Sequence, residues 1–189
     1  MNKHRIAVIV GSLRKESFSK KIALALKEVA PENFDFTFVN LGDLSLYNQD
    51  LEEEGREPEA WKTFRAEIKK HDAFLFVTPE YNRSIPALLK NALDIGSRPY
   101  GHSVWNGKPA AVVSVSPGAI GGFGANHHLR QVLTFLNVLT MQQPEAYVGS
   151  VHTLLDDKGK LSNANTKDFL NQFIAAFGKW IEVHTPLIK

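Results

Sequence analysis

Short apolar runs alternate along the chain with longer stretches in which apolar residues recur at helical spacing. The apolar runs are continuous and rich in β-branched residues, as expected of strands buried on both faces of a sheet. They predict strands over Ile6–Val10, Phe34–Leu41, Ala73–Val77, Ala110–Val115 and, from a weaker pattern, Glu145–Val148. The helical spacing predicts helices over Ser17–Ala30, Glu59–Lys70, Ile85–Ile95, Ala125–Met141 and Asn165–Val183. Five strands that alternate with five helices indicate an α/β domain with a parallel sheet and helices on both faces.

Composition narrows the class of protein further. With 189 residues, of which 43% are hydrophobic, the chain can bury one core, so we expect a single domain over residues 1–189. The formal net charge is +2 and no basic stripe stands out, so we expect no nucleic-acid partner. The absence of cysteine excludes a disulfide scaffold, a thiolate metal site and a cysteine nucleophile. The apolar run Ile6–Val10 is too short for a signal peptide or a membrane span, so we expect a cytoplasmic protein without a membrane partner.

The loop after the first predicted strand has the composition of an anion site. In open parallel sheets, ligands bind beyond the carboxyl ends of the strands. Gly11 lets the chain leave the strand sharply, and three serines and Arg14 then converge on a helix N-terminus, whose free amides attract anions. The loop lacks the dinucleotide and nucleoside-triphosphate motifs, so a single phosphate monoester is the better fit. The alternative is an ordinary helix cap by Ser17 or Ser19, with Arg14 in solvent.

The loops after the third and fourth strands lie at the same edge of the predicted sheet. Pro79 and Pro86 stiffen the first of these loops, so its backbone N–H and C=O groups can recognise the edge of a flat heteroaromatic ring. Tyr81 can pack against that ring or, alternatively, cap the core. The second loop, 114–124, holds four glycines, which indicate either a close backbone approach to a ligand or a flexible turn.

Three other features point to chemistry that we do not expect. Gly101–Trp105 resembles a serine nucleophile elbow, but it ends in Trp and precedes a strand, so a hydrolase is disfavoured. His127 and His128 are adjacent, so they point to different helix faces and cannot grip one metal ion. The acidic run Glu52–Glu54 falls in a predicted long loop, Leu41–Pro58, and is typical of a solvated segment. We therefore expect no metal site.

Three motifs together resemble the NAD(P)H-dependent FMN reductase family. They are Gly11-Ser12-Leu13-Arg14-x-x-Ser17, then Thr78-Pro79-Glu80-Tyr81-Asn82-x-Ser84-Ile85-Pro86, then Leu89-Lys90-Asn91-Ala92-Leu93-Asp94. The stretch His128–Gln131 is similar to the quinone and chromate reductase branch. The resemblance covers nearly the whole chain. It implies one flavodoxin-like FMN-binding domain, a three-layer sandwich whose five-stranded parallel sheet has the order 2-1-3-4-5.

The resemblance also implies which residues bind FMN, without a covalent link. Ser12, Arg14, Ser17 and Ser19 would hold the phosphate, with Gly11 and Phe18 beside them. Pro79, Glu80, Tyr81, Asn82 and Ser84 would line the flavin ring, mostly through the backbone, and Ser116, Pro117 and Gly118 would close its other edge. No catalytic side chain is expected, because the chemistry takes place at flavin N5. The candidate substrate residues are Tyr81, Gly121 and Arg83, which stands where relatives often carry an aromatic residue.

The activity implied is the reduction of quinones or similar acceptors by NAD(P)H, a transient co-substrate. Chromate, azo compounds and free flavin are further possible acceptors, and a ping-pong hydride transfer through N5 is the expected mechanism. The resemblance implies a homodimer or homotetramer. One alternative is a flavodoxin-type electron carrier, although such carriers are usually strongly acidic and this chain is not. Another is a hydrolase or transferase that shares only the fold.

Overall fold

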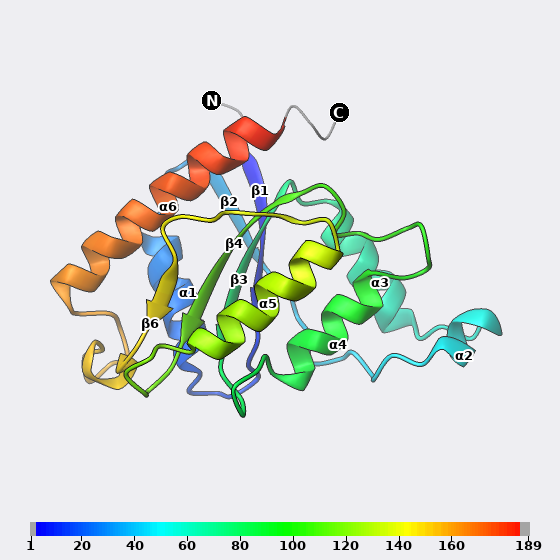
Figure 1. Ribbon diagram of the computed structural model, residues 1–189, viewed down its shortest axis with the longest axis horizontal. Helices are drawn as coiled ribbons and strands as arrows, with labels where there is room; N and C mark the ends of the chain where they lie inside the picture. The colour runs from blue at the N-terminus through cyan, green and yellow to red at the C-terminus, as the bar shows by residue number, and fades with distance from the viewer. Residues whose placement is uncertain (1–2, 186–189) are drawn as a thin grey trace.

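The computed structural model describes residues 3–185 and shows a parallel sheet between two layers of helices (Figure 1). The strands are β1 (His4–Val10), β2 (Phe34–Phe38), β3 (Ala73–Pro79), β4 (Pro109–Val115), β5 (Leu139–Thr140) and β6 (Ala146–Val148). Their order is β2-β1-β3-β4-β5, β6 also pairs with β4, and every pairing is parallel. This confirms the predicted flavodoxin-like order 2-1-3-4-5.

The fifth position of the sheet is divided between two short strands. β5 pairs with the start of β4, at Pro109 and Ala110, whereas β6 pairs with its end, Val113–Val115. The helix predicted over Ala125–Met141 is therefore wrong at its C-terminal end. The observed helix, α5 (Phe123–Phe135), ends before Asn137, which has a φ of 54° and turns the chain back to the sheet. Asn tolerates this left-handed conformation better than most residues do.

The remaining helices are α1 (Phe18–Glu28), α2 (Gln49–Glu53), α3 (Glu59–Lys69), α4 (Ala87–Gly96) and α6 (Ala164–His184), with a 3-10 helix, η1 (Val151–Thr153). The acidic run is not a plain solvated loop, because Glu52 and Glu53 form the last two residues of α2 and Glu54 is its C-cap. Asn48 caps α2 by accepting from the N–H of Asp50, and the Glu52 carboxylate lies 2.9 Å from the guanidinium of Arg98. The long loop predicted over Leu41–Pro58 thus contains a short, anchored helix.

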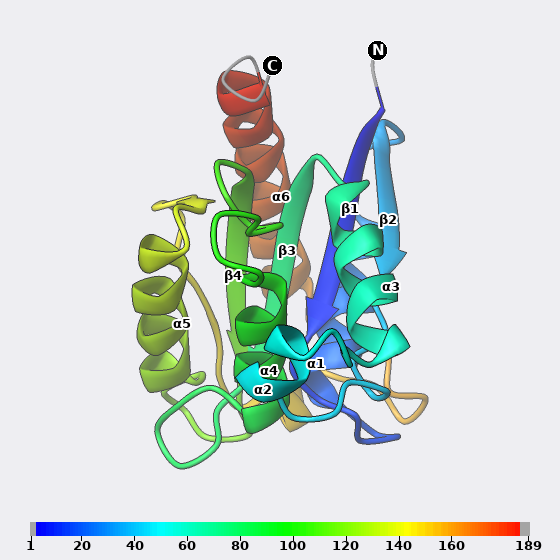
Figure 2. The same ribbon diagram turned by 90° about the vertical axis from the view of Figure 1, so that its right-hand side faces the viewer.

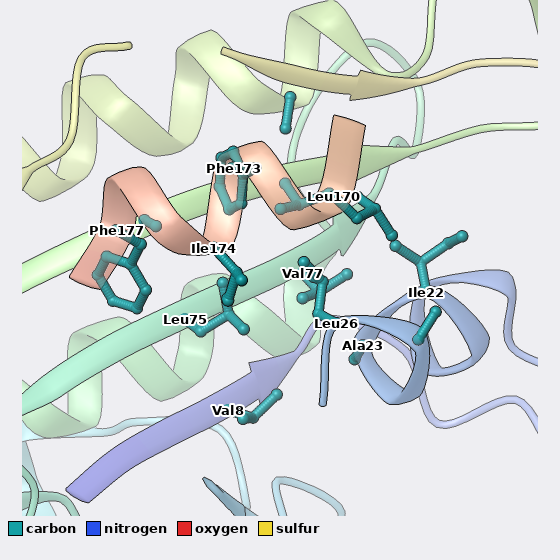
Figure 3. Packing of buried hydrophobic residues seen from close by; sticks show 14 of the residues in the cluster. Val8, Ile22, Ala23, Leu26, Leu75, Val77, Leu170, Phe173, Ile174 and Phe177 are labelled. Atoms are coloured by element: carbon teal, nitrogen blue, oxygen red, sulfur yellow. The ribbon is translucent and has the colours of Figure 1, made fainter. Parts of the chain in front are cut away.

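Two apolar layers hold the helices to the sheet. Successive residues of β3 alternate between them, so Phe74 and Phe76 face α3, α4 and α5, and Leu75 and Val77 face α1 and α6. Figure 2 shows α3 and α4 in front of the sheet and α6 behind it. Figure 3 shows the second layer, in which side chains of α1 and α6 meet those of the strands. Each fully buried aliphatic or aromatic side chain contributes about 1.5–3 kcal/mol, so these layers fix the frame from which the loops emerge.

Candidate functional site

A pocket of about 190 Å³ opens at the carboxyl edge of the sheet. Its walls come from the loops after β1, β3 and β4, and its lining residues are Ser12, Arg14, Ser17, Phe18, Ser19, Pro79, Glu80, Tyr81, Val115, Ser116 and Pro117. The three loops that the sequence singles out therefore meet in space. They do so because β1, β3 and β4 are adjacent and parallel, which brings their carboxyl ends to one edge.

One end of the pocket is a helix N-terminus rich in hydroxyl groups. Ser17 is buried and caps α1, since its Oγ accepts from the N–H of Lys20 at 3.2 Å. Ser19 is 1% exposed, and its Oγ has no hydrogen-bond partner among the described residues. A buried hydroxyl without a partner is costly, and an anionic oxygen would satisfy it. The cap interpretation is confirmed for Ser17, whereas the phosphate site stays a prediction, for which the Ser19 hydroxyl is available.

The loop after β3 forms a tight turn above the pocket. The backbones of Tyr81 and Ser84 exchange two hydrogen bonds, of 2.9 and 3.0 Å, and place Asn82 and Arg83 at the tip with positive φ angles. The side chain of Tyr81 is half exposed and borders the pocket, where it can cover a flat ligand. The side chain of Arg83 is 76% exposed, and its guanidinium lies 3.6 Å from the Glu80 carboxylate.

The glycines of the loop after β4 pack against protein. A Cβ atom on Gly124 would lie 2.8 Å from the carbonyl oxygen of Arg83, and one on Gly121 would lie 2.7 Å from the backbone of Tyr147. Gly122 is the N-cap of α5 and has a φ of 77°, which favours glycine. Gly124 therefore lets the loop after β4 lie against the loop after β3. Gly121 packs against the backbone of Tyr147 and does not line the pocket.

Several residues that the sequence predicts for the site do not line the pocket. Gly11 lies under the pocket, where a Cβ atom would be 3.0 Å from Thr78 Oγ1. The Ser84 hydroxyl points to α5, with its Oγ 2.9 Å from Nδ1 of His128. Gly118, Asn82 and Arg83 are also outside the lining. Val115 is the one lining residue that sequence reasoning missed. Its position at the end of a strand was the available signal, but its apolar side chain indicated only a core role.

Three aromatic side chains, Phe123, His127 and Tyr147, form a cluster next to the loop after β4. The rings of Phe123 and His127 lie 4.1 Å apart, and Nε2 of His127 lies 3.0 Å from the Tyr147 hydroxyl. Burial raises the pKa of the Tyr147 phenol to about 12, and Glu145 adds to the rise. The phenol is therefore protonated at neutral pH and available for this hydrogen bond. His127 and His128 contact different partners, as expected of adjacent helical residues.

The pocket offers little side-chain chemistry of its own. Its one carboxylate, Glu80, accepts from the N–H of Ala125 at 3.0 Å and is 14% exposed. No histidine lines it, and residues 3–185 contain no cluster of three His, Asp or Glu that could hold a metal ion. Within the same range, no helix has the length and apolar character that a membrane crossing needs. The pocket is thus suited to hold a ligand that brings its own reactivity.

Comparisons with known proteins identify the family. Residues 4–153 match the family described as NADPH-dependent FMN reductase. The chain belongs to this family. It is 59% identical to a quinone reductase of Pseudomonas putida, over 96% of each chain, and 45% identical to a 2-hydroxy-1,4-benzoquinone reductase of Burkholderia sp., over 94% of this chain and 96% of that one. The solved structure of FerB, a flavoenzyme NAD(P)H:(acceptor) oxidoreductase of Paracoccus denitrificans, matches with a TM-score of 0.89 and 41% identity, over 96% and 98% of the two chains.

Membership of the family makes the protein an NAD(P)H-dependent oxidoreductase whose cofactor is FMN, and the pocket fits that cofactor. The unpartnered hydroxyl of Ser19, the N-terminus of α1 and the guanidinium of Arg14 suit the phosphate. The half-exposed Tyr81 and the stiff turn beside it suit the flavin ring. The sequence-based assignment of the individual FMN contacts is compatible with this geometry and stays a prediction.

Proposed function

We propose that the protein is a quinone reductase, which reduces quinones with NAD(P)H. The observation that carries the proposal is a recess that joins the predicted phosphate and ring loops and has no free acid or base, in a chain 59% identical to a quinone reductase. When bound, FMN would supply the redox chemistry, which is hydride and two-electron transfer. The 45% identity to a 2-hydroxy-1,4-benzoquinone reductase supports the same class of acceptor.

The chain's own residues bind and orient in this proposal. Ser12, Ser19 and Arg14 hold the phosphate, while the cap by Ser17 keeps the N-terminus of α1 in place. Pro79, Tyr81 and the 116–118 turn position the ring. The Gly118 N–H donates to Ser116 Oγ at 3.0 Å, which keeps that turn closed. No proton transfer by a side chain is required, in agreement with the engagement of Glu80 by Ala125.

We propose a ping-pong sequence, in which NAD(P)H leaves as NAD(P)⁺ before the acceptor enters the same place. The exposure of Tyr81 and Arg83 at the rim supports an open substrate position that also admits chromate, azo compounds and free flavin as slower acceptors. Gly121 serves this position indirectly, through its contact with Tyr147.

The test is a visible spectrum of the purified protein, followed by anaerobic addition of NADPH and then a benzoquinone. We expect a flavin band that NADPH bleaches and the quinone restores, and initial-rate lines that run parallel. A band that NADPH does not bleach would favour an electron carrier. A protein that cannot be loaded with FMN would refute the proposal. Intersecting lines would refute the ping-pong sequence alone.

We propose that the enzyme works as a homodimer or homotetramer in the cytoplasm. An apolar groove of about 780 Å³ runs between α4 and α5, and Phe135 beside it is 90% exposed. Ser84 and His128 also line the groove, so it borders the turn at the cofactor pocket. A second copy of the chain seated here would bury Phe135 and place a subunit boundary next to the flavin. The cysteine-free composition suits a reducing compartment.

A further inference from the structure

A groove of about 360 Å³ lies between α1 and the turn 156–161, and it is strongly basic. Five lysines line it, Lys15, Lys20, Lys21, Lys158 and Lys160, against two glutamates, Glu16 and Glu28. We call it the lysine groove. The excess of three positive charges exceeds the formal net charge of the whole chain, which is +2. The net positive charge of the chain is therefore concentrated at this groove.

The turn that forms one wall is held by its own backbone. The Asp156 carboxylate accepts from the N–H groups of Lys158 and Lys160, at 2.9 and 2.8 Å, and the carbonyl of Asp156 accepts from the N–H of Gly159 at 2.8 Å. A bridge between Leu155 and Leu161 closes the base of the turn. Asp156 thus fixes the turn that carries the two lysines, while its carboxylate and that of Asp157 keep their negative charges but lie outside the groove lining.

Gly159 brings this wall against α1. Its φ is 75°, and a Cβ atom there would lie 2.9 Å from Nζ of Lys21. Lys21 itself pairs with Glu16 at 2.8 Å and lies over the ring of Phe18. Among the described residues, the ammonium groups of Lys15, Lys20, Lys158 and Lys160 have no carboxylate within 4.0 Å. Unpaired ammonium groups facing one groove create a positive potential that favours a multiply charged anion.

The lysine groove and the cofactor pocket share one lining residue, Ser17, so they lie on neighbouring sides of the start of α1. Figure 2 shows the loop before α1 and the turn before α6 at the same edge of the molecule. In the proposed function the FMN phosphate is held by Ser12, Arg14 and Ser19, so it does not need these lysines. An anion bound in the groove would therefore belong to a second ligand, one that also reaches this edge of the sheet.

We propose that the lysine groove binds the phosphates of the adenosine half of NADPH, above all the 2′-phosphate. This inference rests on the proposed function. NADPH and NADH differ only in that phosphate, and Lys ammonium groups bind phosphate as compact point charges. The groove thus gives the enzyme a preference for NADPH. Lys158 and Lys160, on the fixed turn, determine this specificity.

The first experiment measures the phosphate end alone. Adenosine 2′,5′-bisphosphate and 5′-AMP are titrated calorimetrically into the FMN-loaded enzyme. We expect the bisphosphate to bind at least about tenfold more tightly, and its binding to weaken as salt is added, because salt screens exposed charges, with a Debye length of about 10 Å at 0.1 M. The double variant Lys158→Gln/Lys160→Gln loses most of this difference. The matched control Lys62→Gln/Lys179→Gln, which removes two lysines outside the groove, keeps it.

The second experiment measures turnover with each nicotinamide cofactor. In the Lys158→Gln/Lys160→Gln variant we expect kcat/KM for NADPH to fall about tenfold and that for NADH to change less than about twofold. Equal losses with both cofactors, or bisphosphate binding as tight as in the wild type, would overturn the proposal. The proposal would also be overturned if Arg83→Gln lost bisphosphate binding while Lys158→Gln/Lys160→Gln kept it. The bisphosphate carries no nicotinamide, so a protein that binds it but is not reduced by NADPH would refute the proposed function and leave the groove assigned.

Discussion

The carboxylate of Glu80 accepts a hydrogen bond from the backbone N–H of Ala125 at 3.0 Å, although the residues lie 45 positions apart in the chain. The cap position of α5 is Gly122, which has no side chain to offer, so Glu80 supplies the cap from another loop. Its negative charge also complements the N-terminal end of the helix dipole. This one contact ties the loop after β3 to the loop after β4, and both loops line the cofactor pocket.

Replacing Glu80 by Ala should loosen the pocket as well as the helix. We expect a loss of about 0.5–2 kcal/mol in the free energy of unfolding, the usual effect of removing a cap. We also expect the Kd for FMN to rise about tenfold, which corresponds to 1.4 kcal/mol. Urea denaturation and a fluorescence titration with FMN measure the two effects.

Glu80→Gln separates the hydrogen bond from the charge, because the amide oxygen can still accept from Ala125. It should retain most of the affinity for FMN. Glu182→Ala, which removes an exposed carboxylate on α6, serves as the matched control and should change neither quantity. An Ala variant at position 80 that binds FMN as tightly as the wild type would show that the cap does not position the site.

Ser17 and Ser19 lie on the same first turn, but they should respond differently to substitution. Ser17→Ala removes a cap and should destabilise the FMN-free protein by about 0.5–2 kcal/mol. Ser19→Ala removes an unpartnered buried hydroxyl, so the FMN-free protein should keep its stability or gain some. With FMN, Ser19→Ala should raise the Kd about tenfold, because hydrogen bonds to charged groups contribute roughly 1.5–3 kcal/mol. Unchanged FMN binding by Ser19→Ala would remove this hydroxyl from the phosphate site.

Much of the fold follows from the apolar pattern, because strands buried on both faces leave continuous runs such as Ala73–Val77. The pattern fails where the signal is local and weak. Leu139 continues the apolar spacing of α5, yet it pairs together with Thr140 with the start of β4 instead. The helix ends because the backbone is left-handed at Asn137, and one Asn in a sequence is a weak predictor of such a turn.

The site was predictable at the level of loops, and less so at the level of side chains. A parallel sheet brings the three loops to one edge, and the resemblance to the family named most of the residues that line the pocket. The glycines after β4 indicated a close approach, but the partner proved to be the backbone of Arg83 and Tyr147. Contacts such as Glu80 with Ala125 depend on tertiary packing between distant segments, which one sequence does not display.

Phe135 provides a test of the proposed assembly. The side chain is 90% exposed beside the groove between α4 and α5, and a second copy seated there would cover it. Phe135→Asp should shift the protein towards monomers without lowering its stability, because the ring packs little within one chain. Sedimentation velocity measures the state, and Val183→Asp, which charges an exposed position on α6, is the control. A wild-type protein that sediments as a monomer would refute the assembly.

Lys108 should make the stability of the enzyme depend on pH. Its Nζ donates to the carbonyl oxygens of Ile68 and Lys69, each at 3.2 Å, at the end of α3. Burial lowers its pKa from 10.5 to about 8, although Asp72 opposes the shift. Between these two values the unfolded chain binds more protons than the folded protein, so this group makes stability rise with pH. We expect the stability of the wild type relative to Lys108→Met to rise from pH 8 to 10.5 and to stay level below pH 8. Urea denaturation of both proteins across this range measures the difference, and a difference that stays constant would contradict the shift.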